Sequence, residues 1–591
     1  MAPADLDPTR GFYLDTGAHR VFAIEHPAEA ADVAGTPVLL CAPWGWDEVA
    51  SYRSRKRWAE RLAGAGFTTL RFDLPAVGDS DGHPSDPDLG PAWVAAVRTA
   101  AEWLRARTGV ESVAALGLGL GGLLAREAIA AGAPIDQLVL WGAPETGRAF
   151  AREARAFSRL QRWEADELTE PGAIEAGGFL LSAGTVDWLK GLGVEGGPPR
   201  APRRALLLDR DGVGADGLRD ALAAANVEVE TATGQGWAAM FDHPERSRLP
   251  AAVAETVERW LREGGEGATA SGAAPGAEAT AELALDAVVE SALAFETSRG
   301  RIFGVLARPA AETEAADDGL LAVFLNAGAV RHSGPDRLWV EASRRAAAAG
   351  VPSLRVDLEA IGESDGDEEP LLRVEEFYVP RYADELVGLL EQFDQAGLGR
   401  RFALLGLCAG GYWSYRAALV DDRVSDAVLV NPGALVWTDE LLSEREARKL
   451  TRVVDRRWLR RLLTGDIRGE LIVAALRSLV RRLVGLPARL WRRLRHGPEE
   501  DWYEADLDRL RDHGTRLTLA FSGNEPVDEE LTAAAVPERL ERWPNVRYER
   551  LPGEDHTLRP LSAQRALLEL FEERLAVAAE AAAAQAGSRQ R

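Results

Sequence analysis

One cysteine sits in a setting that favours reactivity. Cys408 lies in the middle of the segment GLCAGG (406–411), which follows an apolar run of strand length and precedes a helix-forming segment. Small residues on both sides of a nucleophile permit a strained turn that lifts its side chain above a sheet. The thiolate of a cysteine attacks acyl carbons, so the pattern predicts covalent acyl chemistry at Cys408.

The elements that must position Cys408 occur twice in the chain. Asp73 in GFTTLRFDLPAVGDSDG and Asp357 in GVPSLRVDLEAIGESDG lie 284 residues apart, and we interpret both segments as fold-shaping turns rather than as sources of a catalytic acid. The flanking segments also recur, as apolar runs and glycine turns at 38–46 and 322–330, and at 113–128 and 402–417. Each copy opens with a hairpin pattern and then alternates strands with helices, which predicts a mainly parallel sheet with helices on both faces.

With its strand, G-x-nucleophile-x-G turn and helix, the sequence resembles the α/β-hydrolase family over about residues 10–262 and 290–578. The GLCAGG turn is similar to that of members with a cysteine nucleophile, such as dienelactone hydrolases and polyhydroxyalkanoate synthases. The expected fold is therefore α/β, as two tandem α/β-hydrolase domains with a helical basic cap in the second.

The resemblance implies a triad whose acid and histidine follow the nucleophile along the chain. His556 in LPGEDHTLRP would be the base, and Glu525 at the end of LTLAFSGNEP would orient it. Glu525 stands where the family usually has aspartate, so Asp528 is kept as the alternative acid. We expect Asp555, beside the histidine, to shape the loop.

The same resemblance predicts the oxyanion donors. They would be the backbone N–H of Ala409 and the loop at Gly328 and Ala329. His332 in this loop could contact substrate, but we expect it to be a solvated loop histidine. Cys41, the other cysteine, lies inside the apolar run VLLCAPWG and is expected to be a core residue.

The first copy lacks the nucleophile, because glycine occupies that position at Gly119 in GLGLGG. Asp211 and His243 stand where the acid and the base would be. Covalent catalysis by this copy is not expected. Two interpretations remain, a degenerate copy kept for packing and a domain that still binds a ligand or partner.

Composition divides the chain further. Residues 263–285 include a Gly/Ala/Ser/Glu-rich stretch, typical of a flexible linker, between a first half (1–262) and a second half (286–580). We interpret residues 581–591 as a frayed helix end or a tail.

A strongly basic insertion is predicted at about 436–500, where the family often has a cap. Residues 445–495 hold 16 Lys and Arg against 4 Asp and Glu, and Ile472, Leu476 and Leu479 recur at helical spacing. The amphipathic helix would cover the active site, bind an acidic partner such as an acyl carrier protein, or lie on an anionic membrane surface.

The net charge of −24 argues against nucleic-acid binding. No phosphate-binding loop, histidine cluster or C-x-x-C pair occurs, so no cofactor or metal is expected. Without a leader-like or membrane-spanning pattern, the expected location is the cytoplasm, with peripheral membrane contact as an option.

The sequence thus predicts a hydrolase of esters or thioesters with an apolar acyl part. The alternatives are an acyltransferase and a non-catalytic binding protein.

Overall fold

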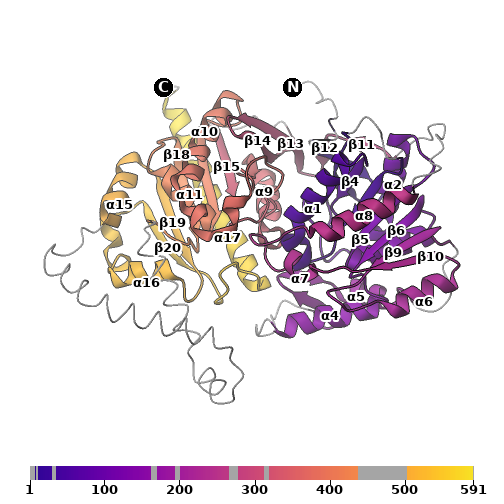
Figure 1. Ribbon diagram of the computed structural model, residues 1–591. Helices are drawn as coiled ribbons and strands as arrows, with labels where there is room; N and C mark the ends of the chain where they lie inside the picture. The colour runs from indigo at the N-terminus through magenta and orange to yellow at the C-terminus, as the bar shows by residue number, and fades with distance from the viewer. Residues whose placement is uncertain are drawn as a thin grey trace, which may run out of the picture.

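A computed structural model (Figure 1) describes residues 7, 9, 11–29, 35–160, 170–193, 200–264, 277–311, 319–436 and 502–589. The predicted basic cap, beyond residue 436, lies outside the described residues, and so does its amphipathic helix. Two nine-stranded sheets, one in each half, form the framework. The predicted fold class is confirmed by these sheets and the helices on their faces.

The sheet of the first half has the spatial order β10-β9-β6-β5-β3-β4-β2-β1-β11. Its central strands β4, β3, β5, β6, β9 and β10 run parallel, whereas β1 and β2 pair in antiparallel fashion at one side. Its strands are β1 (Phe12–Asp15), β2 (Arg20–His26), β3 (Val38–Cys41), β4 (Thr69–Phe72), β5 (Val113–Leu118), β6 (Ile135–Trp141), β9 (Arg204–Leu208), β10 (Glu228–Ala232) and β11 (Ala279–Thr280). A separate hairpin joins β7 (Ile174–Ala176) and β8 (Phe179–Leu181).

The sheet of the second half has the order β12-β13-β14-β16-β15-β17-β18-β19-β20. This is the order of the first sheet when that sheet is read from its other edge, from β11 to β10. The same neighbours occur in both sheets. In the second half β15 pairs with β17, as in Val323 with Leu404, and in the first half their counterparts β3 and β5 pair, as in Leu39 with Ala115. Its strands are β12 (Glu282–Ala284), β13 (Val288–Thr297), β14 (Gly300–Pro309), β15 (Leu320–Leu325), β16 (Ser353–Val356), β17 (Arg401–Leu407), β18 (Val424–Val430), β19 (Arg516–Phe521) and β20 (Val546–Arg550).

Helices cover both faces of the first sheet because the strands are apolar on both sides. Trp58, Trp237 and Trp260 build the core on one face, and Trp93 and Leu123 belong to the core on the other. The helices are α1 (Trp46–Gly64), α2 (Leu89–Thr108), α3 (Leu120–Ala130), α4 (Gly147–Leu160), α5 (Ala183–Lys190), α6 (Asp216–Ala224), α7 (Trp237–Met240) and α8 (Ala251–Gly264).

The second sheet is covered in the same way. Trp339 and Phe571 pack on one face, and Trp413, Leu386 and Leu507 on the other. The helices are α9 (Leu338–Ala348), α10 (Pro380–Gln395), α11 (Ala409–Ala418), α15 (Trp502–His513), α16 (Pro526–Ala533) and α17 (Leu561–Arg589), with short 3₁₀ turns at Pro335–Arg337, Glu369–Leu372, Val374–Tyr378 and Pro537–Arg542.

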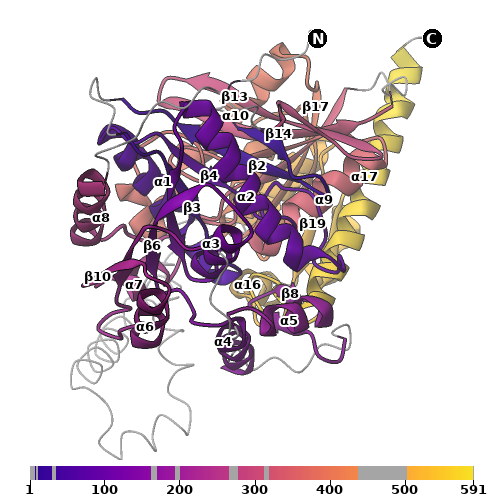
Figure 2. The same cartoon turned by 90° about the vertical axis from the view of Figure 1, so that its right-hand side faces the viewer.

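One predicted boundary needs correction. Residues 277–285 were assigned to the flexible linker, yet β11 pairs with β1 of the first sheet and β12 with β13 of the second. Backbone pairing at two sheet edges and the burial of Leu283 order this stretch despite its small side chains. Helix α17 continues to Arg589, which agrees with the interpretation of residues 581–589 as a helix end (Figure 2, yellow).

No helix within the described ranges combines the length and the apolar character needed to cross a bilayer.

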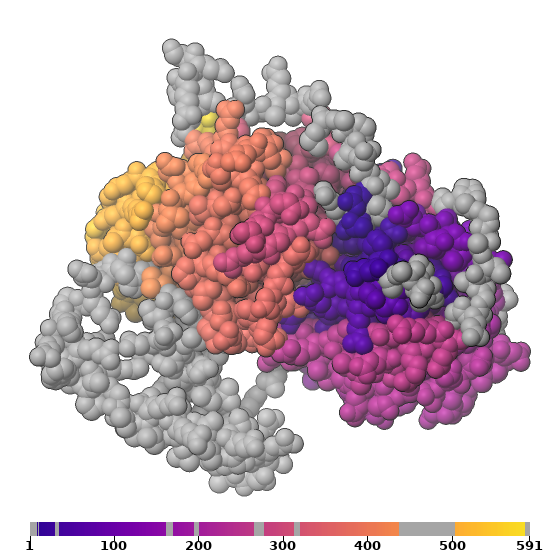
Figure 3. Space-filling view, turned by 45° about the horizontal axis from the view of Figure 1, so that its top comes forward, coloured from indigo at the N-terminus to yellow at the C-terminus, as the bar shows by residue number. Residues whose placement is uncertain are grey.

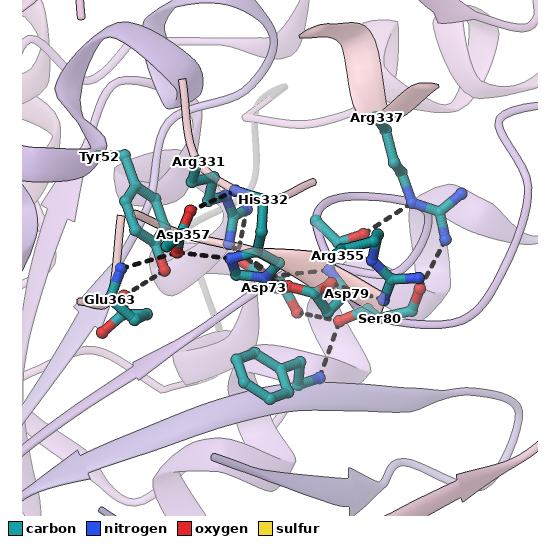
Figure 4. A network of polar contacts seen from close by, with 12 residues as sticks. Tyr52, Asp73, Asp79, Ser80, Arg331, His332, Arg337, Arg355, Asp357 and Glu363 are labelled. Carbon is teal, nitrogen blue, oxygen red and sulfur yellow. Dashed lines mark hydrogen bonds and ion pairs between the residues drawn. The ribbon is translucent and has the colours of Figure 1, made fainter. Parts of the chain in front are cut away.

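The two halves contact each other through the two repeated turns. Figure 3 shows the two halves side by side. Arg71 of the first half donates to both carboxylate oxygens of Glu363, at 2.9 and 2.8 Å. Arg355, which occupies the position of Arg71 in the second copy, donates to Asp79, the counterpart of Glu363, at 3.1 Å. All four side chains are buried. Each half therefore neutralises a buried charge of the other in a reciprocal arrangement. Figure 4 shows one of the two pairs, Arg355 with Asp79.

His332 lies at the centre of this interface, and the prediction of a solvated histidine was wrong. Its side chain is fully buried, with Nδ1 2.7 Å from Asp357 and Nε2 2.7 Å from Asp79 (Figure 4). Burial alone would lower the pKa of His332, but the two carboxylates outweigh it and raise the pKa to about 10. The cause of the error is packing: the loop after β15 faces the first half instead of water.

Asp357 has the structural role expected of it. Besides His332, it accepts hydrogen bonds from the side chain of Asn326 at 2.8 Å and from the backbone N–H of Glu363 at 2.9 Å. The turn is thus tied to the loop that precedes α9.

Candidate active site

The turn around Cys408 has the geometry of a nucleophile elbow. Strand β17 ends at Leu407 and helix α11 begins at Ala409. Cys408, between them, has φ 57° and ψ −115°, a strained conformation for a residue other than glycine. A Cβ at Gly406 would collide with the backbone of Gly410, so the turn requires glycine there. The thiol is partly exposed above the end of the sheet.

His556 and Glu525 meet in the structure as a pair. Nδ1 of His556 lies 3.1 and 3.0 Å from the two carboxylate oxygens of Glu525. Glu525 is 4% exposed at the start of α16, whereas the side chain of His556 is 41% exposed and accessible to a substrate. A carboxylate at Nδ1 fixes the ring and leaves Nε2 for the nucleophile.

Cys408 and His556 each shift the pKa of the other. Burial by itself would raise the pKa of the Cys408 thiol, but the positive charge of His556 and hydrogen bonds from His556, Tyr378 and the Ala409 N–H lower it overall. Burial would lower the pKa of His556, yet Cys408 and Glu525 raise it well above its usual value. Both shifts act in favour of a thiolate beside an imidazolium, which is the reactive form of a catalytic cysteine.

Three side chains around this pair escaped the sequence analysis. Tyr378 places its hydroxyl 3.7 Å from Sγ of Cys408. Asn431, after β18, donates to the carbonyl of His556 at 2.8 Å and to the hydroxyl of Ser522 at 2.9 Å. No motif marks Tyr378, but Asn431 and Ser522 each follow directly after a strand, the usual position for functional side chains in parallel sheets.

The alternative acid is engaged elsewhere. Asp528 accepts hydrogen bonds from the hydroxyl of Tyr548 and from Arg550, on the outer strand of the sheet. Asp555 accepts from the backbone N–H of Thr557 at 3.1 Å and pairs with Arg559. The structure therefore brings Glu525 to the histidine, and it places Asp555 in the loop-shaping role we expected.

The expected oxyanion donors surround the same turn. The N–H of Ala409 points to the sulfur of Cys408, and Gly328 adopts φ 59° in the loop after β15. The N–H of Ala329 donates to Oε1 of Glu245 at 3.4 Å. Glu245 belongs to the first half, and the sequence analysis gave it no role.

The partial triad of the first half is not assembled. Asp211 accepts the backbone N–H groups of Gly236 at 2.6 Å and Ala238 at 2.9 Å, so it caps helix α7. His243 contacts Glu245 instead, and its ring lies edge-on to Trp46 with centroids 5.8 Å apart.

The position of the missing nucleophile is closed. A Cβ at Gly119 would lie 3.3 Å from Pro43 and 3.8 Å from the ring of Trp237, and Trp237 is 4% exposed. Trp237 stacks on Phe241 with ring centroids 4.0 Å apart. A side chain at position 119 would therefore lie against Pro43 and the buried ring of Trp237.

Cys41 is 1% exposed, and burial raises its pKa to about 12. Its interpretation as a core residue is confirmed.

Part of the first half matches a known family model. Residues 37–182 match the family model described as the alpha/beta hydrolase fold. No curated protein matches the chain. Among solved structures, Est1E from Butyrivibrio proteoclasticus is similar at 17% identity over 42% of this chain and 96% of its own, with a TM-score of 0.30. A dienelactone hydrolase from Anabaena variabilis is similar at 15% identity over 48% and 95%, with a TM-score of 0.30.

The matched family model and the strand order together confirm the resemblance inferred from the sequence: this is a protein of α/β-hydrolase fold. The division into two tandem domains stays a prediction, as does the assignment of the site residues.

Proposed function

We propose that the second half hydrolyses acyl esters or thioesters through a covalent acyl-cysteine intermediate on Cys408. His556 is the acid and base, Glu525 holds and stabilises the imidazolium, and the N–H groups of Ala409 and Ala329 bind the oxyanion. The observation that carries the proposal is the geometry, with Cys408 in the elbow turn and Glu525 at 3.0 Å from Nδ1 of His556. The lowered pKa of Cys408 and the raised pKa of His556 support it.

The first stage acylates the enzyme. The thiolate of Cys408 forms a bond to the carbonyl carbon, and the carbonyl π electrons move to oxygen, which the two N–H groups stabilise. When the tetrahedral intermediate collapses, the bond to the leaving alcohol or thiol breaks, and that group takes the proton of His556. Neutral His556 and an acyl-thioester remain.

The second stage releases the acid. His556 takes a proton from water, the hydroxide attacks the thioester carbon, and collapse expels the Cys408 thiolate. If an alcohol or amine attacks in place of water, the same residues carry out acyl transfer. The acceptor therefore decides between hydrolysis and transfer.

The test uses short- and medium-chain nitrophenyl esters and acyl-thioesters with intact-mass spectrometry. Wild type and Cys41→Ser should both gain the mass of one acyl group, because Cys41 is buried. Cys408→Ala should gain none and lose turnover. Equal adducts in Cys408→Ala and wild type would refute the proposed nucleophile.

The state of the thiol has its own test. The rate of alkylation by iodoacetamide should stay high below pH 8, because the pKa of Cys408 is lowered by His556. His556→Ala should move the midpoint of the rate profile upward, toward about 8.5 or higher. A profile that is the same in both proteins would contradict the pairing.

A further inference from the structure

A residue of the first half contacts the loop of the second half that would supply an oxyanion donor. Oε1 of Glu245 accepts the N–H of Ala329 at 3.4 Å, and a Cβ at Gly328 would lie 2.6 Å from the same oxygen. The absence of a side chain at Gly328 is what allows the carboxylate to come so close. Glu245 thus lies against the loop that the proposed mechanism uses to bind the oxyanion.

The segment that carries Glu245 is held firmly. Arg53 of α1 donates to the carbonyls of Glu245 at 3.0 Å and Ser247 at 2.8 Å, and the hydroxyls of Ser54 and Ser247 are 2.7 Å apart. The ring of His243 contacts the other oxygen of Glu245. The carboxylate is therefore fixed in place, with 17% of the side chain exposed.

The first half also borders the histidine loop of the second. The N–H of Leu561 donates to Glu175 at 3.3 Å, and Gln564 donates to the carbonyl of Gly178 at 2.9 Å. The guanidinium of Arg559 lies 5.9 Å from the ring centre of Trp46. The first half thus contacts both the loop at Ala329 and the segment that follows His556.

We propose that Glu245 is a specificity-determining residue of the second half's active site, which disfavours acyl groups that carry a negative charge and favours those that carry a positive one. The inference rests on the proposed function, since it concerns the same site. A fixed carboxylate at an oxyanion donor repels a second anion and attracts a cation, and the carbonyl oxygen of a substrate must displace it from Ala329. The first half, without a nucleophile of its own, thereby selects substrates for the other half.

The first test measures charge preference at Cys408 without any acyl chemistry. Cationic trimethylammonioethyl and anionic sulfonatoethyl methanethiosulfonate modify the thiol, and intact mass gives the two rates. The control variant is Asp242→Asn, since Asp242 is on the same segment but half exposed and paired with Arg246. Glu245→Gln should shift the cation-to-anion rate ratio by roughly tenfold toward the anion, as expected for a unit charge near the reacting group. Asp242→Asn should leave the ratio within about twofold.

Glu245→Asp keeps the charge on a shorter side chain and should keep a cation preference. Glu245→Asp also controls for a general disturbance of the loop, because such a disturbance would change the rate ratio of Glu245→Asp and Glu245→Gln alike. An unchanged ratio in Glu245→Gln, or an equal shift in Asp242→Asn, would overturn the proposal.

The second test measures kcat/KM for esters of equal acyl length that end in methyl, carboxylate or trimethylammonium. Glu245→Gln should improve the carboxylate substrate relative to the trimethylammonium one by a similar factor. If the thiol ratio shifts and no ester is turned over, the proposed function fails while the charge selection by Glu245 stands. If esters are turned over with unchanged preference, the selection fails while the proposed function stands.

Discussion

Unfolding of this protein at mildly alkaline pH should release a proton that belongs to His332. The native pKa of His332 is raised to about 10, because burial is outweighed by Asp79 and Asp357, whereas a histidine in the unfolded chain has a pKa of about 6.5. Between these values the native state holds one proton more than the unfolded state. The resulting stability is fully present below pH 6.5 and is lost as the pH rises through 10.

The magnitude follows from the linkage relation. One proton corresponds to about 1.4 kcal/mol per pH unit, or roughly 5 kcal/mol over the whole window, as an order of magnitude. The assay mixes native protein with guanidinium chloride in weakly buffered solution at pH 8.5 and counts the protons released, so it needs no two-state assumption. Wild type should release about one proton more than His332→Gln.

A second pH value separates His332 from its neighbours. At pH 5.5 an unfolded histidine is itself protonated, so the difference between wild type and His332→Gln should fall to near zero. His83→Gln, at an exposed site, controls for the substitution itself. Equal proton release by wild type and His332→Gln at pH 8.5 would refute a charged His332 at the interface.

Three further outcomes are expected. Glu525→Gln should lower kcat by about 10²- to 10⁴-fold, because the imidazolium of His556 loses its counter-charge. Asp528→Asn should keep kcat within about threefold of wild type, and steady-state kinetics of the two variants measures both effects. Arg71→Met should lower the free energy of unfolding by about 3–5 kcal/mol in urea denaturation, because Glu363 loses a buried partner. Gly119→Ser should gain no acyl adduct beyond the one expected at Cys408, as checked by mass spectrometry, and should cost about 1–2 kcal/mol of stability, since φ is 51° there; a second adduct, at this serine, would contradict the loss of the first site.

The architecture was predictable because its signals are local. Strands such as β15 and β17 are continuous apolar runs, and glycine turns mark the points where strand passes to helix. The repeat shows the same order of strands, turns and helices twice, which predicts two similar sheets. The elbow at Cys408 follows from the same local rules, since only small neighbours permit its backbone geometry.

The residues that join the halves could not be found in this way. Glu245 is 84 positions from Ala329, and Asp79 is 253 positions from His332. Such contacts depend on how two finished surfaces pack, and packing leaves no periodicity in either segment. His332 therefore looked like an ordinary loop residue, although it is fully buried. The boundary at residues 277–285 was missed for a related reason, because strand pairing there relies on backbone groups that composition does not reveal.

The reciprocal pairing of Arg71 with Glu363 and of Arg355 with Asp79 has a consequence for assembly. The surfaces that meet are built from corresponding segments, and they do not distinguish a half of their own chain from the same half of another chain. What keeps the contact internal is the covalent connection of the halves, which raises the effective concentration of one half near the other. As two separate chains, the same halves would meet only by bimolecular association, so the burial of Arg71, Asp79, Arg355 and Glu363 would come to depend on protein concentration.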